Sequence, residues 1–251
     1  MHSAKLVASL LVLLTLVLVV APAQAETVNC TAITALPAII TVQGVYCFIG
    51  DLATAMTEGS AIDIQTNNVV LDLNGFKLGG LAAGRGTRAT GIFADNRQNV
   101  TIKNGTVRGF NGGISLTAGL SQGHVIENIR ADQNTAVGIS ALGADVIVRN
   151  NQVVATGGST LQDAAAVGIV VGFGKGPRVL NNEVINTVKQ GGTGQGIVFE
   201  FCDEGLAVNN RITGADIGIS YVFATGKYHD NLTFDIPMPF FGNGTDAGNN
   251  N

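Results

Sequence analysis

A short motif that recurs along most of the chain is the feature that most limits how it can fold. Each copy has a Gly–Ile pair in a strand-like run, and successive pairs are separated by 22, 25, 30, 28 and 22 residues. A recurrence of this length, made of strand-like segments, is typical of a solenoid in which each repeat forms one coil and packs only on its neighbours. The pairs are Gly91-Ile92, Gly113-Ile114, Gly138-Ile139, Gly168-Ile169, Gly196-Ile197 and Gly218-Ile219.

Side-chain positions within each repeat follow from the strand period of two. Successive side chains of a strand point to opposite faces, so the isoleucines of the Gly–Ile pairs are predicted to stack as one column in the core. A recurring Asn is predicted at a sharp corner, because Asn and Gly tolerate the left-handed backbone region, and stacked Asn side chains can hydrogen-bond between coils. The residue after it, mostly Gly or Asn, is interpreted as a second position in that region. The corner residues are Asn74, Asn104, Asn128, Asn150, Asn181 and Asn209.

The composition agrees with a tightly turning β structure. The chain has 34 Gly, no Trp and only 13% charged residues, whereas a typical charged share is about a quarter. A helical bundle would expose more Lys and Glu, so the deficit argues against one. The formal net charge of −4 makes nucleic acid an unfavourable partner, and none is predicted.

The first 25 residues have the pattern of a secretory signal peptide. A weakly basic start precedes an apolar run over residues 6–20, and Ala23-Gln24-Ala25 has the small-x-small form of a cleavage site. We therefore predict cleavage after Ala25 and a secreted or periplasmic protein. The apolar run is shorter than the roughly 20 residues of a membrane span, and no other stretch reaches that length, so no transmembrane segment is expected in the mature chain.

Residues 26–56 contain neither a corner Asn nor a Gly–Ile pair and are predicted to be an N-terminal cap, because an open solenoid end leaves strand edges unpaired. In an oxidising compartment Cys30 and Cys47 are predicted to form a disulfide there; the alternative is two buried free thiols. Cys202 is then left over and is predicted to be a buried thiol. The solenoid is predicted over residues 57–236, followed by a polar, mobile tail over residues 237–251.

Three long Gly-rich insertions occupy equivalent places in their repeats. Residues 79–90, 156–166 and 187–195 all lie between the last strand of one repeat and the next Gly–Ile strand. They are therefore predicted to emerge on the same side of the solenoid. Insertions collected on one face are where repeat proteins usually place a binding surface.

Residues 99–114, Asn-Val-Thr-Ile-Lys-Asn-Gly-Thr-Val-Arg-Gly-Phe-Asn-Gly-Gly-Ile, resemble the repeat of right-handed parallel β-helix proteins, the superfamily of pectate and pectin lyases. The Cys-x₁₆-Cys segment followed by residues 68–76 looks like the first coils of bacterial members. The resemblance covers about residues 30–233 and implies an all-β, single-stranded right-handed parallel β-helix of about seven coils. Related proteins include lyases, hydrolases and epimerases of polysaccharides, and also structural or adhesive proteins.

The resemblance allows a test for glycoside-hydrolase chemistry, which needs two suitably spaced carboxylates. The sequence has no Asp-Asp pair, and Ser121-Gln122-Gly123-His124 matches only half of the Gly-His-Gly motif of polygalacturonases. Outward positions after the Gly–Ile pairs should face the groove and contain no acid, so a lyase or epimerase is favoured over a hydrolase if the chain is an enzyme. These positions are Phe93, Ser115, Ser140, Val170, Val198 and Ser220, of which the first three are candidate substrate-binding residues, together with Tyr228.

Lyase-like chemistry would need carboxylates that hold calcium and a basic residue that removes a proton beside a uronate carboxyl. The candidate catalytic residues are Lys175, Arg178, Asp203 and His229. The candidate calcium ligands are Glu200, Asp203 and Glu204. The alternative for all of them is a solvated rim of mutual ion pairs. His124 is interpreted as a structural strand residue, and Lys103, Glu127 and Arg149 as an outward column of alternating charge.

Two functional hypotheses follow. In the first, the protein binds or acts on an acidic polysaccharide along the face framed by the three long loops. In the second, it is a non-catalytic structural or cell-surface scaffold or adhesion protein. The absence of acids from the groove row and the scarcity of aromatic residues favour the second hypothesis, whereas the family resemblance favours the first, and a fold by itself does not decide between them.

Overall fold

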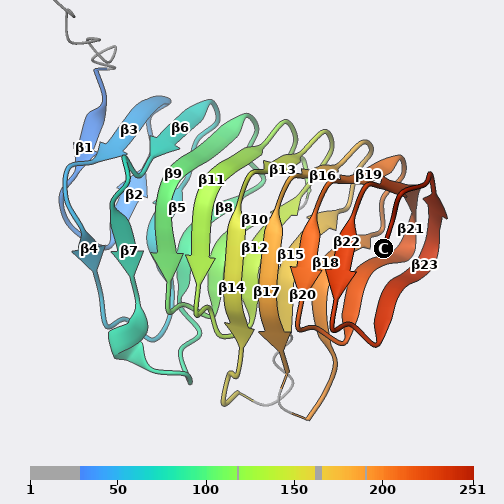
Figure 1. The fold of residues 1–251 in the computed structure, drawn as a ribbon. Helices are drawn as coiled ribbons and strands as arrows, with labels where there is room; N and C mark the ends of the chain where they lie inside the picture. The colour runs from blue at the N-terminus through green and yellow to red at the C-terminus, as the bar shows by residue number, and fades with distance from the viewer. Residues whose placement is uncertain (1–28, 118, 162–165, 190) are drawn as a thin grey trace, which may run out of the picture.

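The chain winds into a solenoid of stacked coils, each built from three short strands (Figure 1). The computed structural model describes residues 29–117, 119–161, 166–189 and 191–251. Corresponding strands of successive coils pair in parallel and form three sheets, which we call A, B and C in the order in which a coil enters them. The predicted fold, a right-handed parallel β-helix, is confirmed. The predicted signal peptide lies outside the described residues. Among the described residues, no helix has the length and apolar character to cross a membrane.

The strands divide among the sheets as follows. Sheet A contains β2 (Ala38–Ile40), β5 (Ser60–Ile64), β8 (Thr90–Asp95), β10 (Gly112–Thr117), β12 (Val137–Leu142), β15 (Ala166–Gly172), β18 (Gly194–Glu200) and the first parts of β21 (Ile217–His229) and β23 (Met238–Asp246). Sheet B contains β1 (Thr31–Ile33), β3 (Gly44–Phe48), β6 (Val69–Asp72), the first parts of β9 (Val100–Arg108) and β11 (Val125–Asp132), β13 (Ile147–Arg149), β16 (Arg178–Leu180), β19 (Gly205–Val208) and the last parts of β21 and β23. Sheet C contains β4 (Leu52–Ala53), β7 (Lys77–Gly79), the last parts of β9 and β11, β14 (Gln152–Gly157), β17 (Glu183–Val188), β20 (Arg211–Thr213) and β22 (Leu232–Phe234). A 3₁₀ turn, η1 (Leu81–Ala83), lies in the first long loop.

The predicted isoleucine column runs through the core on sheet A. Each isoleucine is the register partner of the isoleucine in the next coil, and all of them are fully or almost fully buried. Ile62 extends the column toward the N-terminus, and Phe240 is the partner of Ile219 at the other end. Vertical stacking of like side chains therefore supplies the continuous core that one coil alone cannot form.

The glycine of each Gly–Ile pair is needed for space. A Cβ on Gly168 would lie 2.6 Å from the carbonyl oxygen of Gly196 in the next coil and 2.6 Å from Cγ1 of Val184 on sheet C. Gly138 and Gly196 would meet the next coil and a sheet C side chain in the same way. The glycine thus leaves room for the next coil and for a side chain of sheet C.

We expect Gly168→Ala to lower the free energy of unfolding by about 1–3 kcal/mol, because the added methyl overpacks this contact. Gly50→Ala is the matched control, since a Cβ there meets no atom within 4 Å, and we expect it to change stability by less than about 0.5 kcal/mol. Urea denaturation followed by circular dichroism measures both. Equal losses in the two variants would contradict the close-approach explanation.

The corner asparagines adopt the left-handed conformation, as predicted. All six have φ between 51° and 56°. Some also bond between coils as expected: the Nδ2 of Asn209 donates to the Oδ1 of Asn181 at 2.8 Å. For the residue that follows the corner, the prediction of positive φ is confirmed at Gly75 and wrong at Gly105, Asn151, Asn182 and Asn210. These three asparagines point into the core instead.

These inward residues form a second row, which we call the inner Asn ladder. In each step the Nδ2 of one Asn donates to the Oδ1 of the next at 3.0 or 3.1 Å. The same Oδ1 also accepts the backbone N–H of the preceding member. The ladder therefore pairs buried polar groups at a corner where strand hydrogen bonds are interrupted. Its members are Asn151, Asn182, Asn210, Asn231 and Asn250.

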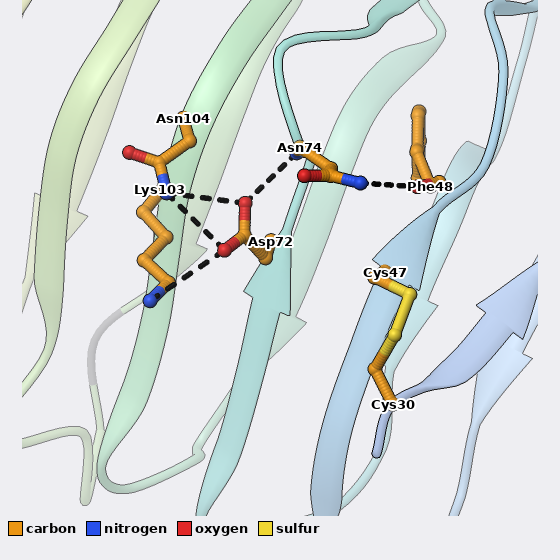
Figure 2. The surroundings of a disulfide bond; sticks show 7 residues. All are labelled: Cys30, Cys47, Phe48, Asp72, Asn74, Lys103 and Asn104. Atoms are coloured by element: carbon orange, nitrogen blue, oxygen red, sulfur yellow. Dashed lines mark hydrogen bonds and ion pairs between the residues drawn. A yellow bond between two sulfur atoms is a disulfide. The ribbon is translucent and has the colours of Figure 1, made fainter. Parts of the chain in front are cut away.

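The N-terminal segment differs from the predicted cap, because its described part already forms the first coil. Strands β1, β2, β3 and β4 pair in parallel with strands of the same sheets. The predicted disulfide between Cys30 and Cys47 is present and ties the start of β1 to β3, as Figure 2 shows. This segment lacks both the corner Asn and the Gly–Ile pair. Its place in the solenoid therefore depends on backbone pairing with the next coil and not on the repeat motif.

The C-terminal segment differs from the predicted tail in the same way. Strand β23 pairs in parallel with β21 along sheets A and B, so residues 238–246 belong to the solenoid. Asn250 continues the inner Asn ladder. Within the described residues sheet A thus has nine strands, more than the seven coils expected from the repeat.

The outward charged column on sheet B agrees with the prediction. Lys103, Glu127 and Arg149 are register partners, and an Arg149 nitrogen lies 2.7 Å from a Glu127 carboxylate oxygen. Asp72 begins the column: its carboxylate lies 3.5 Å from the Lys103 Nζ and accepts the Nδ2 of Asn104 (Figure 2). This column is a surface ladder that stabilises the sheet modestly.

Candidate functional site

The outer face of sheet A lies between two differently built corners. At the corner from sheet C to sheet A, the long loops emerge on one side of the solenoid, as predicted, along the lower edge in Figure 1. At the corner from sheet A to sheet B most connections are turns of four or five residues, and the connection between β10 and β11 is longer. The outer face of sheet A and its two edges are therefore the candidate functional surface.

The predicted groove row is real, and sequence reasoning missed its two ends. Phe93, Ser115, Ser140, Val170, Val198 and Ser220 are register partners in successive coils. Ile39 and Asp63 precede Phe93 in this row and Phe241 follows Ser220, so the row does contain one acid. Asp63 was missed because its repeat has Ala61 in place of the glycine. We call these nine residues the outer row.

The middle of the outer row is suited to contact rather than chemistry. Phe93, Ser115 and Ser140 are half-buried and face outward, as their assignment as substrate-binding residues requires. Ser220 is buried, and its hydroxyl donates to the Oε1 of Gln195 at 3.0 Å. Short hydroxyl and aliphatic side chains dominate, so the row offers a smooth surface with few charges.

The structure brings Lys175, Asp203 and Glu204 together at the corner from sheet A to sheet B. Lys175 and Asp203 are bridge partners, the Lys175 Nζ lies 3.0 Å from a Glu204 carboxylate oxygen, and the Thr225 hydroxyl donates to Asp203 at 2.9 Å. The hydrogen bond that Lys175 donates to the Glu204 carboxylate raises the pKa of Lys175. A general base at neutral pH needs the opposite change, so this ion pair opposes the catalytic role predicted for Lys175.

The remaining catalytic candidates lie at opposite ends of sheet B. Arg178 begins β16, three residues after Lys175 and beside the same corner, and is exposed. His229 ends the sheet B part of β21, where its Nδ1 lies 2.7 Å from a carboxylate oxygen of Asp230. The two corners of sheet B are separated by the length of β19, which for four residues is about 13 Å. The four candidates therefore do not form one constellation.

Tyr228 was expected on the binding surface, and this prediction is wrong. Its ring points into the core and stacks on Phe240, with ring centroids 4.6 Å apart. Burial raises its pKa. The reason is strand parity, because Tyr228 is the register partner of the buried Ala207.

The three carboxylates predicted as calcium ligands do not converge. Glu204 is paired with Lys175, and Asp203 accepts from Thr225. Glu200 ends β18, where burial raises the pKa of its carboxyl. Across the described ranges, no three His, Cys, Asp or Glu side chains gather as metal ligands would.

Cys202 is a buried thiol, as predicted. It lies in the core beside the corner. Burial, and secondarily the charges of Asp203 and Glu200, raise the pKa of this thiol to about 12. A thiol that is protonated at neutral pH is a poor nucleophile, so Cys202 packs rather than reacts.

On the opposite edge, the first two long loops meet at Arg85. The backbone N–H of Thr160 donates to the Arg85 carbonyl at 3.2 Å, and the Ser159 hydroxyl donates to it at 3.5 Å. The Arg85 guanidinium lies against Gly158, where a Cβ would overlap it. The two loops thus bridge the two intervening coils, which have only short turns at this corner.

Two adjoining cavities lie beneath this bridge. Their volumes are about 300 and 410 Å³, and Arg85, Ala155 and Gly157 line both. The smaller one is also lined by Thr135, a buried residue whose hydroxyl has no hydrogen-bond partner among the described residues. Arg85 is exposed, and within the described ranges its side chain makes neither an ion pair nor a hydrogen bond. Sequence reasoning predicted the loop face but did not single out Arg85.

A third feature was missed entirely. Phe173, Phe201 and Phe223 form an exposed row at the corner from sheet A to sheet B. The ring of Phe201 stacks on that of Phe223, and the ring of Phe173 is tilted by 42° to that of Phe201. Each lies five residues after the glycine of a Gly–Ile pair, so the repeat contained the signal. We call these three residues the phenylalanine column.

Comparison with known proteins places the fold. The family described as "Right handed beta helix region" matches residues 59–235. The crystal structure of the Dettilon tailspike protein (gp208) is similar with a TM-score of 0.47 and 14% sequence identity, over 88% of this chain and 59% of that one. Tailspike protein gp49 from Acinetobacter baumannii bacteriophage Fri1, a capsular polysaccharide depolymerase, has a TM-score of 0.36 and 10% identity, over 82% of this chain and 48% of that one. No curated protein matches the sequence.

Proposed function

Because the chain belongs to the right-handed β-helix family, we propose that it binds an acidic polysaccharide at the corner from sheet C to sheet A, where the long loops meet. The observation that carries the proposal is Arg85, which lines two adjoining cavities under a bridge of two loops. A planar guanidinium with several donors is well suited to a carboxylate or sulfate group on a sugar.

The charges around this edge support an anionic ligand. Asp132 is the nearby carboxylate on sheet C, and Arg108 and Arg130 already pair with it at 3.3 and 3.5 Å. Arg88 adds a further exposed positive charge in the first loop. Among the described residues that line the two cavities, Arg85 is the one charged side chain and none is acidic, although the whole chain is acidic.

We propose binding rather than catalysis, because the candidate catalytic residues are spread over two corners of sheet B and Glu204 holds Lys175 in its protonated form. The alternative function is a non-catalytic scaffold, which the hydroxyl and aliphatic character of the outer row favours. Export to an oxidising compartment is part of the proposal and is supported by the disulfide between Cys30 and Cys47.

Titration calorimetry with trigalacturonate and with its methyl ester tests the proposal, with and without calcium, since Ca²⁺ binds carboxylate oxygens. We expect the acid to bind more tightly than the ester, and Arg85→Gln to weaken binding of the acid about ten- to a hundredfold, the value of a charge-assisted hydrogen bond. A sulfated trisaccharide distinguishes sulfate from carboxylate recognition.

Arg88→Gln is the matched control, because Arg88 is an exposed arginine of the same loop that lines neither cavity. We expect it to change the dissociation constant less than about threefold, because salt screens the long-range attraction of an exposed charge that does not contact the ligand. Equal weakening by both variants would reduce the effect to non-specific charge. Failure of every acidic and neutral glycan to bind would leave the scaffold.

A further inference from the structure

The phenylalanine column is an exposed stack of rings along one edge of sheet A. Its ring centroids are 5.0 Å apart between Phe173 and Phe201 and 5.3 Å apart between Phe201 and Phe223. The residues are 44%, 51% and 77% exposed in chain order. A row of large apolar side chains left in solvent is uncommon on a protein that does not use it for binding.

The backbone of the column is strained as well. Phe173, Phe201 and Phe223 have φ of 55°, 47° and 49°. This left-handed region is unfavourable for a residue with a Cβ. At the same corner other coils place Asn96 or Gly143, which tolerate it far better. Three coils therefore combine strain with exposure, and neither stabilises the fold, which points to selection for a function.

The stack is open at both ends. Gly143, the next residue of this corner toward the N-terminus, has no side chain to cover Phe173. Toward the C-terminus the last coil is shorter at this corner. Gly242 pairs with Tyr221 and Gly244 pairs with Gly226, so Asn243 is the single residue that crosses the corner there. A ligand can thus reach the edges of the rings and the outer ring face of the stack.

Polar groups border the column on both sides. Glu200 precedes Phe201, and its half-buried carboxyl has neither a hydrogen-bond nor an ion-pair partner within the described ranges. Asp203 and Thr225 follow the column, joined by their hydrogen bond. An apolar strip one ring wide between hydrogen-bonding groups complements a sugar, which has an apolar face of C–H groups and a rim of hydroxyls.

We propose that the phenylalanine column binds the apolar face of neutral sugar units, with the carboxylates of Glu200 and Asp203 accepting hydrogen bonds from their hydroxyls. The inference rests on the proposed function and deepens it. At this corner the carboxylates of Glu200, Asp203 and Glu204 outnumber the cations Lys175 and Arg178, so the corner disfavours a uronate, whereas Arg85 attracts one at the opposite edge. The two edges are separated by the width of sheet A, about 20 Å for a six-residue strand. The ligand class is therefore a heteropolysaccharide with acidic and neutral units.

The size of the column favours a single sugar chain over a protein partner. A Phe side chain buries roughly 150–250 Å² when fully covered, and these three are about half exposed. Together they offer on the order of 300 Å², well below the roughly 800 Å² per partner of a standard protein interface.

The test is a titration with three neutral hexasaccharides, cellohexaose, maltohexaose and a β-1,3-glucan hexasaccharide, followed by calorimetry and by NMR of ¹³C-labelled Phe rings. We expect at least one of them to shift the ring signals of the column. Phe201→Gly and the triple variant with Phe173→Gly and Phe223→Gly are expected to weaken that binding at least about tenfold. Glycine removes the rings and also relieves the strain, so these variants should fold.

Phe234→Gly is the control. Phe234 is as exposed as Phe223 but lies away from the phenylalanine column, at the end of a sheet C strand. Its own φ is not positive, whereas that of the next residue, Asp235, is. We expect it to leave the affinity for the neutral hexasaccharide within twofold. Binding that survives in the triple variant would overturn the inference. If no neutral hexasaccharide binds while trigalacturonate binds in an Arg85-dependent way, the inference is overturned and the proposed function is retained. If neither kind of ligand binds, both are overturned.

Discussion

Asn182→Ala is expected to lower the free energy of unfolding by about 3–5 kcal/mol, the largest loss that we predict for one side chain. Asn182 is 2% exposed. Its Oδ1 accepts from the backbone N–H and the Nδ2 of Asn151, both at 3.0 Å. Its Nδ2 donates to the carbonyl of Val148 at 2.9 Å and to the Oδ1 of Asn210 at 3.0 Å. Truncation leaves several buried polar groups without a partner, and each costs about 1–3 kcal/mol.

The neighbouring corner residue provides the control. Asn181→Gly removes an exposed side chain at φ 55°, a conformation that glycine adopts freely, and it removes one bond to Asn209. We expect a change below about 1 kcal/mol. Urea denaturation followed by circular dichroism compares the two, with the slope checked for loss of a single transition. A similar small effect of both variants would show that the inner Asn ladder does not hold the corner together.

The contrast between these two asparagines explains what sequence reasoning could and could not predict about the fold. The isoleucine column and the corner positions follow from local rules, the strand period of two and the tolerance of Asn for positive φ. The inner Asn ladder does not. Asn181 and Asn182 are the same residue type side by side, and only the course of the chain through the corner turns the second one into the core.

The two ends of the solenoid were missed for a different reason. Strands β1 to β4 and β23 lack the repeat motif, yet they pair because a finished coil presents unpaired backbone groups to any extended segment beside it. The repeat motif contains the residues that a coil needs in order to pack on a neighbouring coil on each of its two sides. A terminal coil needs a partner on one side only, so its sequence can depart further from the repeat.

The candidate site was predictable in part. The loop face and the proximity of Lys175, Asp203 and Glu204 followed from the equivalent positions of these residues in successive repeats. Tyr228 was placed on the wrong face because the short last coils gave no reliable parity. The members of the phenylalanine column lie at a constant offset from the Gly–Ile pair. However, the tolerance of Asn and Gly for positive φ predicts one of those two residues at such a corner, and burial of apolar side chains predicts no exposed Phe. Departures from those rules are expected at functional sites.

A pH-dependent loss of stability is expected from His124, which sits in the core between coils of sheet B. It is 1% exposed. Its Nδ1 accepts the backbone N–H of Val100 at 3.2 Å, so Nε2 carries the proton of the neutral ring. Nε2 has no hydrogen-bond partner among the described residues. Burial lowers the pKa of His124 to about 4 from an ordinary value of 6.5.

The sign follows from which state takes up the proton first. Below about pH 6.5 the unfolded chain protonates His124, whereas the folded chain does so only near pH 4. Stability therefore falls as the pH is lowered through this window and levels off below it. The difference of 2.5 pH units corresponds to about 3 kcal/mol. Protonation of Nδ1 would also remove the acceptor for the Val100 N–H.

His124→Gln tests this expectation, because Gln is neutral at every pH and can still offer an acceptor to Val100. Denaturant midpoints measured from pH 7 to pH 4 should fall steeply for the native chain and much less for the variant, with the two curves approaching each other near pH 4. His229→Gln, at a partly exposed histidine outside the core, should leave the steep fall in place. If His124→Gln retained the full slope, the acid sensitivity would have to come from the carboxylates of the surface ladders instead. Among the described residues His124 is the one buried imidazole, and its protonation thus links acidity to folding between about pH 6.5 and pH 4.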